Sequence, residues 1–213
     1  AVMHGQLPDC VPVCPDISNM IPARLTGKQF WDIYVYQDPP LWKAYIDAAR
    51  YFDIDAGFEL YDFGDLFDDK PACERRIVDR RRDGSFVTQQ YYPESGEWSK
   101  YIEVHTAALP PSELVKPKTI GLPAVPSTWE PVTGAKQWPK GMELWKHIKR
   151  ELGDQGVLGM PSGMSTLIVT DKDDIIEYNH QPEKFNQRRE EMLLRAEKHL
   201  EVIAGLQEKP DFL

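Results

Sequence analysis

The stretch over residues 51–69, YFDIDAGFELYDFGDLFDD, constrains the fold more than any other part of the chain. It predicts the end of a helix and then a short apolar strand over residues 57–61. A cluster of carboxylates follows the strand: Asp62, Asp65, Asp68 and Asp69. A helix, a strand and acidic side chains just past the strand's carboxyl end are typical of the site of an α/β enzyme. The stretch therefore marks a candidate site.

Composition excludes some classes of partner. The 213 residues carry a formal net charge of -9, which argues against nucleic acid, because phosphate binding needs a basic face. No stretch approaches the ~18 apolar residues of a membrane span. Three cysteines without a recognisable signal peptide favour a reducing compartment over a disulfide framework. We therefore expect a cytoplasmic protein that binds neither nucleic acid nor membrane.

The segment Val11–Ile17 is short, apolar and bracketed by prolines, which predicts a buried first strand. Asp16, at its end, is either a site residue or a cap of the following turn. Cys10 and Cys14 have the spacing of two metal thiolates, but no second Cys/His pair follows at the distance of a zinc site. The sequence therefore predicts no metal site.

A loop or short helix is expected over residues 20–27, with Arg24 as its only cation. Arg24 either holds an anionic group of a substrate or pairs with a nearby carboxylate. A helix is expected to follow, with Asp38 as its N-cap and Pro39 in its first turn. The apolar stripe predicted for this helix is Leu41, Tyr45, Ala48, Ala49 and Phe52.

Residues 75–105 predict a three-stranded antiparallel meander. An Asp83-Gly84 pair separates the first two β-rich runs, and the turn 93–96 separates the second from the third. Asp-Gly between β-rich runs is a strong hairpin signal. The arginines at 80–82 either attract a phosphate or carboxylate or, as the preferred interpretation, protect a solvated edge strand by their charge.

Residues 107–139 are dense in proline and predict a long loop with the character of a lid. Trp129 and Trp138 are expected to anchor this loop by packing on the surface of a barrel. A helix is predicted next, over residues 140–152, with Met142, Trp145, Ile148 and Leu152 as its apolar face.

A strand beginning at Val157 is expected to run into a loop of small residues. Such residues let a ligand approach backbone amides at a helix N-terminus, or they allow tight packing of a helix on a strand. Its candidate ligand-binding residues are Gly159, Ser162, Gly163, Ser165 and Thr166. A long helix is predicted from Pro182 to about residue 206, and the start of a further strand follows it.

The order of these elements is typical of half a (β/α)₈ barrel. We therefore expect an α/β fold, a partial (β/α)₈ TIM barrel with an inserted antiparallel β-meander. Residues 1–213 are expected to form a single domain of this kind. The site would then lie at the C-terminal mouth of the barrel.

Three segments resemble the uroporphyrinogen decarboxylase superfamily, which includes porphyrinogen decarboxylases and corrinoid-dependent methyltransferases. Residues 7–13, LPDCVPV, resemble the start of the family's first strand. Residues 50–62, RYFDIDAGFELYD, resemble the helix-to-strand segment that ends in the decarboxylase's active-site aspartate. Residues 159–167, GMPSGMSTL, resemble the Gly-rich strand end that lines the substrate cavity. The resemblance implies that Asp62 is catalytic and that Asp16, Arg24 and the small-residue loop bind substrate.

The resemblance covers the first half to two-thirds of a family member. The decarboxylases carry an arginine-rich motif where this chain has SNMIPARLTG with Arg24 alone. The meander ending near Tyr92–Gly96 is more similar to the methyltransferase members. The resemblance therefore implies a methyltransferase or demethylase component that acts with a corrinoid (methylcobalamin). It implies zinc as well for the full-length enzyme, but the family's zinc ligands lie in its second half, so no metal site and no cofactor are assigned to these residues.

Two alternatives stay open. One is a uroporphyrinogen-type decarboxylase (a carboxy-lyase), in which Asp62 would hydrogen-bond pyrrole N–H groups and no cofactor is needed. The other is a non-catalytic half-barrel fragment or subunit that needs a complementary chain. The partners expected are a small molecule or corrinoid protein as substrate, and a second copy or the missing half barrel.

Overall fold

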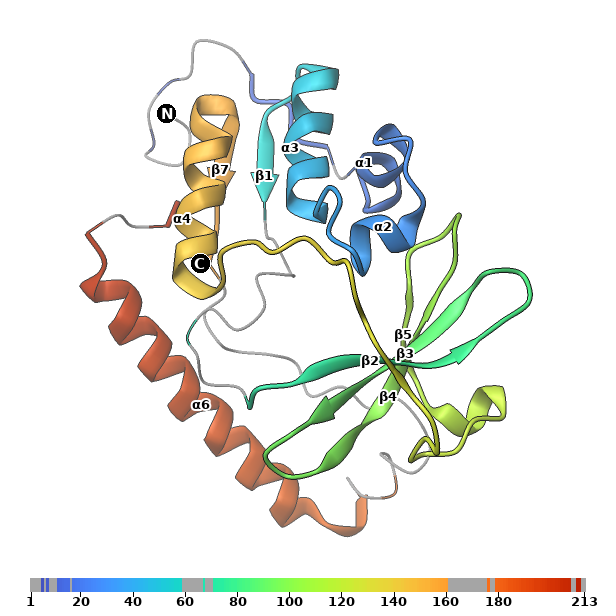
Figure 1. Ribbon diagram of the computed structural model, residues 1–213. Helices are drawn as coiled ribbons and strands as arrows, with labels where there is room; N and C mark the ends of the chain where they lie inside the picture. Colours follow the sequence, from blue (N-terminus) through green and yellow to red (C-terminus); the bar gives the residue numbers. More distant parts are fainter. Residues whose placement is uncertain are drawn as a thin grey trace. The chain divides into compact units, whose positions relative to one another are not determined.

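The computed structural model describes residues 5, 7, 11–15, 17–58, 67, 71–160, 176, 179–207 and 210–211 (Figure 1). The chain divides into two compact units. The first, here called the sheet unit, comprises Cys10–Ala56 and Asp62–Gln155; the second, the α6 unit, comprises Ala1–Asp9, Gly57–Tyr61 and Gly156–Leu213. Each unit is described by itself.

A five-stranded antiparallel sheet is the largest β-structure of the sheet unit (Figure 1). Its strands are β2 (Glu74–Arg80), β3 (Phe86–Tyr92), β4 (Glu97–His105), β5 (Ser112–Val115) and β6 (Glu130–Pro131). Their order is β5-β4-β3-β2-β6, and every neighbouring pair is antiparallel. On the outermost strand β5, Leu114 has φ 57°, in the left-handed region that non-glycine residues seldom adopt.

The two hairpin turns explain why the central strands pair in sequence order. Gly84 has φ 86° and donates its N–H to the Arg81 carbonyl (3.1 Å), while Gly96 has φ 72° and donates to the Tyr92 carbonyl (2.9 Å). Glycine adopts these positive φ values without the steric cost of a Cβ. The antiparallel pairing predicted from the Asp-Gly signal is confirmed for β2, β3 and β4.

Four α-helices belong to the sheet unit in the described residues: α1 (Met20–Leu25), α2 (Phe30–Tyr34), α3 (Leu41–Phe52) and α4 (Gly141–Leu152). Two 3₁₀ turns, η2 (Pro117–Ile120) and η3 (Gly153–Gln155), accompany them. A capping box begins α2, in which the side chains of Gln29 and Asp32 each accept the other residue's backbone N–H. The helix predicted over residues 140–152 is confirmed within one residue at its start.

The predicted start of α3 is wrong. The helix begins at Leu41, and Pro40 takes the N-cap position that we expected for Asp38. The Asp38 carboxylate instead lies 2.6 Å from Lys136 Nζ, and the hydrogen bond from Lys136 lowers the pKa of Asp38. The buried face is also rotated from the predicted stripe, since Phe52 is exposed. The buried residues of α3 are Trp42, Ala44, Ile46, Ala48 and Ala49.

One face of the sheet packs on the segment that follows α2. Val35, Ile77 and Phe86 form a buried cluster there. Phe86 also contacts Trp31 and Tyr36, whose ring centroids lie 5.8 and 6.4 Å from its own. These apolar contacts fix α2 against β2 and β3.

The proline-rich segment 107–139, here called the strap, contains β5, η2 and β6. Gln89 Nε2, from β3, donates to the Ala124 carbonyl of the strap (3.1 Å). The two predicted anchors contact the surface as expected, but that surface is not a barrel. Trp129 stacks on the Arg76 guanidinium of β2, and Trp138 packs edge-on against Trp42 of α3 (5.2 Å between centroids).

The α6 unit contains a two-stranded parallel sheet of β1 (Ala56–Phe58), which starts at the unit boundary, and β7 (Gly156–Leu158). The long helix α6 (Pro182–Gly205) confirms the helix predicted there. Asp211 pairs with Leu158 of β7 in both directions, with its carboxylate accepting the Leu158 N–H (2.7 Å) and its own N–H donating to the Leu158 carbonyl (3.1 Å).

The predicted partial (β/α)₈ barrel is wrong. The largest β-structure is antiparallel, and no closed barrel or β/α repeat is present in the described residues. Residues 11–15, expected as the buried first strand, are exposed and irregular. The apolar runs that suggested barrel strands are short, and short runs cannot by periodicity alone be assigned to one kind of sheet.

The described residues contain no helix with the length and apolar character needed to cross a membrane.

The packing of α4 gives a first prediction. Ile148 on α4 is fully buried, so Ile148→Ala is expected to lower the free energy of unfolding of the sheet unit by about 2–5 kcal/mol, through lost burial and a residual cavity. Urea unfolding followed by tryptophan fluorescence measures it, since all six tryptophans lie within the sheet unit.

Ile21→Ala on α1 is the matched control. Ile21 is exposed, so its truncation is expected to cost less than about 1 kcal/mol. Equal losses for the two variants would contradict the placement of the α4 face in the core.

Candidate functional site

The parallel strands β1 and β7 are the part of the structure that bears on the predicted site. Each follows a helix closely in the chain, β1 after α3 and β7 after α4. Because the strands are parallel neighbours, their carboxyl ends lie at the same edge of the sheet. The chain continues from β1 toward Asp62 and from β7 directly into Gly159.

Most of the predicted site residues lie outside the described residues: Asp16, Asp62, Ser162, Gly163, Ser165 and Thr166. Only two predicted site residues are described. Gly159 is buried at the end of β7, and Arg24 is exposed in the last turn of α1. They belong to different units, so the structure tests neither the grouping of the predicted site nor the roles assigned to its members.

The segment that leads into β1 is held by Asp55, a residue that was not predicted from the sequence. Asp55 accepts the Val13 N–H on Oδ2 (2.7 Å) and donates its own N–H to the Val13 carbonyl (2.9 Å). Gln155, just before β7, donates Nε2 to the Ile54 carbonyl (2.9 Å). These bonds join the segments that precede the predicted site. An acid immediately before an apolar strand was the signal that could have identified Asp55.

An ion-pair network joins α3 to α4 within the sheet unit. Lys43 Nζ lies 2.6 Å from the carboxylate of Asp47 and 3.1 Å from that of Glu151. Arg50 Nη2 also donates to the Glu151 carbonyl (2.6 Å). The hydrogen bond from Lys43 lowers the pKa of Glu151. These charges are partly exposed, and ion pairs of this kind contribute little net stability.

Among the described residues, His105 is the most deeply buried ionisable group. Its side chain is 1% exposed. Nε2 lies 2.8 Å from Thr88 Oγ1, on β3, and 3.5 Å from Glu103 Oε2. The ring stacks on Phe86, with 5.0 Å between centroids and 30° between planes. Within the described residues, Nδ1 has no hydrogen-bond partner.

The surroundings of His105 keep its imidazole neutral. Burial, with a contribution from the positive charge of Arg75, lowers the pKa of His105 from 6.5 to about 3. Arg75 is held nearby, because it donates to the Tyr34 carbonyl (3.0 Å) and pairs with Glu103 (3.2 Å). The ring is enclosed by Thr88, Glu103 and Phe86, so this cluster belongs to the interior of the sheet unit rather than to an open site. No sequence motif identified His105, since two of its contacts, Thr88 and Phe86, lie on another strand.

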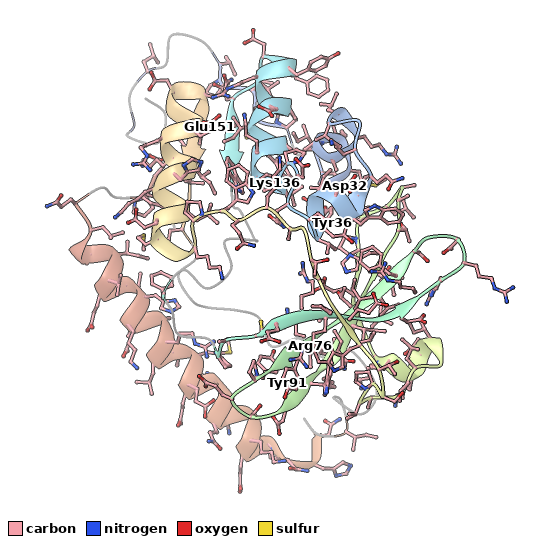
Figure 2. The ribbon with its side chains drawn as sticks, in the orientation of Figure 1. Asp32, Tyr36, Arg76, Tyr91, Lys136 and Glu151 are labelled. Carbon is pink, nitrogen blue, oxygen red and sulfur yellow. The ribbon has the colours of Figure 1, made fainter. Side chains whose placement is uncertain are left out.

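A second cluster surrounds Arg76 on β2, which Figure 2 labels together with Tyr91. The Arg76 guanidinium carbon lies 3.7 Å from the centre of the Tyr91 ring and 3.8 Å from that of the Trp129 ring. Glu74 accepts hydrogen bonds from Nη2 (2.7 Å) and Nε (3.1 Å). Two aromatic faces and an in-plane carboxylate make a favourable site for an arginine.

The described residues do not fit a zinc site. They contain no group of three or more His, Cys, Asp or Glu side chains placed to hold a metal ion. Cys14 and Cys73 are exposed free thiols, and Cys10 lies outside the described residues. No catalytic step is therefore assigned to zinc.

Comparison of the chain with protein families, with curated proteins and with solved structures finds no match in any of the three.

The environment of His105 predicts a pH dependence of stability. Its pKa is about 3 in the folded state and about 6.5 when exposed, so between these values the unfolded state binds more protons. Stability therefore falls as pH decreases through this window, by up to about 1.4 kcal/mol per pH unit from this group. The variant His105→Gln is expected to lack that component.

Urea unfolding at about pH 7, 5.5 and 4.5, followed by tryptophan fluorescence, measures the difference in slope between wild type and variant. His180→Gln is the control, because His180 is exposed, and its slope is expected to match that of the wild type. Parallel dependences for wild type and His105→Gln would contradict a buried neutral imidazole.

Proposed function

We propose that this protein takes part in the transfer of a methyl group to or from a corrinoid, in the cytoplasm. The corrinoid-dependent methyltransferases of the uroporphyrinogen decarboxylase superfamily, which the chain resembles, carry out such transfers. The support from sequence is the resemblance of residues 7–13, 50–62 and 159–167 to segments of that superfamily. The partner is a small-molecule substrate or a corrinoid protein.

The observation that carries the proposal is the parallel pairing of β1 with β7. The segments resembling the superfamily's active-site aspartate and Gly-rich loop are those that leave these two strands. Both segments therefore continue from the same edge of this small sheet. Ligands of parallel sheets bind outside the carboxyl ends of the strands.

In this proposal Asp62 holds a polar group of the substrate or corrinoid. Its carboxylate acts as a hydrogen-bond acceptor or as a base. The hydroxyls of Ser162, Ser165 and Thr166 supply further polar contacts, and the small side chains of the loop give a ligand access to the backbone.

The methyltransferase is preferred to the decarboxylase because of the cations available after residues 11–17. Recognition of a tetrapyrrole with eight carboxylates requires several positive side chains. Residues 18–27 contain one, Arg24, which lies exposed in the last turn of α1. Binding of a single anionic group by Arg24 is compatible with the methyltransferase.

The proposal predicts the behaviour of Asp62→Asn. This variant keeps the size of the side chain but removes its charge, so demethylation of methylcobalamin in the presence of a thiol acceptor is expected to slow at least about tenfold. The measurement is the change in visible absorbance when the cobalt-bound methyl group leaves, with and without added zinc.

Asp69→Asn is the matched control and is expected to retain wild-type rates, because it lies in the same acidic stretch but does not match the superfamily's aspartate. The proposal fails if the wild-type protein neither binds nor demethylates methylcobalamin. Turnover of uroporphyrinogen, lost in Asp62→Asn, would establish the decarboxylase instead.

A further inference from the structure

Within the part of the chain that the structure describes, strand pairing covers only part of the outer edge of β2. β2 has seven residues, but β6 has two and pairs with β2 at Arg76↔Pro131 and Ile77↔Glu130. In the continuous described range 71–160, no other strand lies along this edge. A strand edge with unpaired backbone groups can accept another extended segment.

The segment that now pairs with this edge contacts β2 through its side chains as well as its backbone. Trp129 stacks on the Arg76 guanidinium at 3.8 Å. The next residue, Glu130, accepts a hydrogen bond from Arg80 Nε at 2.9 Å. The edge therefore offers one subsite for an aromatic ring and a neighbouring one for a carboxylate.

The contacts of this segment are individually weak. Pro131 has no N–H and cannot donate to β2. The Arg80–Glu130 ion pair joins side chains that are 51% and 58% exposed, and exposed pairs contribute little net stability. Trp129 is itself 46% exposed. A segment held in this way can be displaced by a stronger competitor.

We propose that the outer edge of β2 is a strand-addition site for an extended segment of another protein in which an aromatic residue is followed by an acidic one. The chain's own Trp129–Pro131 occupies this site and competes with the partner. The choice of partner follows from charge complementarity, because Arg76 and Arg80 line the edge and already bind a ring and a carboxylate. Addition of a strand to a sheet edge is a common mode of peptide recognition. This inference does not depend on the proposed methyl transfer.

The test uses a fluorescent peptide of residues 126–133, PSTWEPVT, as the probe. Fluorescence anisotropy measures its binding to the full chain and to the variant Trp129→Ala/Glu130→Ala. The tethered segment competes at an effective concentration on the order of millimolar, so removal of its side chains is expected to tighten peptide binding by about tenfold or more. Glu130→Gln, which removes only the ion pair, is expected to tighten binding about threefold.

A charge exchange tests the carboxylate subsite. In the background of the double variant, Arg80→Glu is expected to weaken binding of PSTWEPVT and to favour the peptide PSTWRPVT, in which the acid is replaced by arginine. Arg82→Glu is the matched control, because Arg82 is exposed beyond the end of β2, and it is expected to preserve the original preference.

Two results would overturn the proposal. One is equal binding of PSTWEPVT and of PSTAAPVT to the double variant, since an edge without subsites would not distinguish them. The other is dimerisation of the wild-type chain, seen by light scattering and abolished by the free peptide, which would assign the edge to a second copy of the chain. Loss of folding in the double variant leaves Glu130→Gln to decide the outcome.

Discussion

Coverage of both faces of β3 is the constraint on which the sheet unit depends. Four successive residues, Phe86, Val87, Thr88 and Gln89, are all buried. Successive side chains of a strand point to opposite faces, so neither face of β3 is open to water at these positions. One face is closed by the segment around α2 and the other by the strap.

Burial of polar side chains on β3 requires partners, since an unpaired buried group costs free energy. Thr88 meets His105, and Gln89 donates to the carbonyls of Ser99 and Ala124. The strap is therefore held by the hydrogen bond that the buried Gln89 side chain donates to it, as well as by its aromatic contacts. Further backbone bonds close the arrangement, from Phe30 to the Ala107 carbonyl (3.0 Å) and from Lys136 to the Tyr36 carbonyl (2.8 Å).

Local signals in the sequence predicted local structure well. The Asp83-Gly84 turn placed a hairpin correctly because its geometry depends on neighbouring residues alone. Proline near residue 40 located α3 but not its buried face, which is set by distant contacts such as that of Trp42 with Trp138. The barrel failed for the same reason, because short apolar runs do not specify which strands pair. Of the candidate site, only Gly159 and Arg24 fall in the described residues, and the clusters at His105 and Arg76 depend on contacts across strands that no sequence motif records.

The left-handed backbone at Leu114 gives the sheet two unequal ends. β5 is four residues long and has a left-handed residue at its third position, so its outer edge is a poor template for a further strand. A further strand would therefore add on the β2 side, where, among the described residues, a two-residue strand that ends in a proline pairs with the edge. The two edges of the sheet therefore differ in their capacity to pair. If two copies of the sheet associated through their edges, they would pair through β2, and the assembly would end after one junction instead of extending into a fibre.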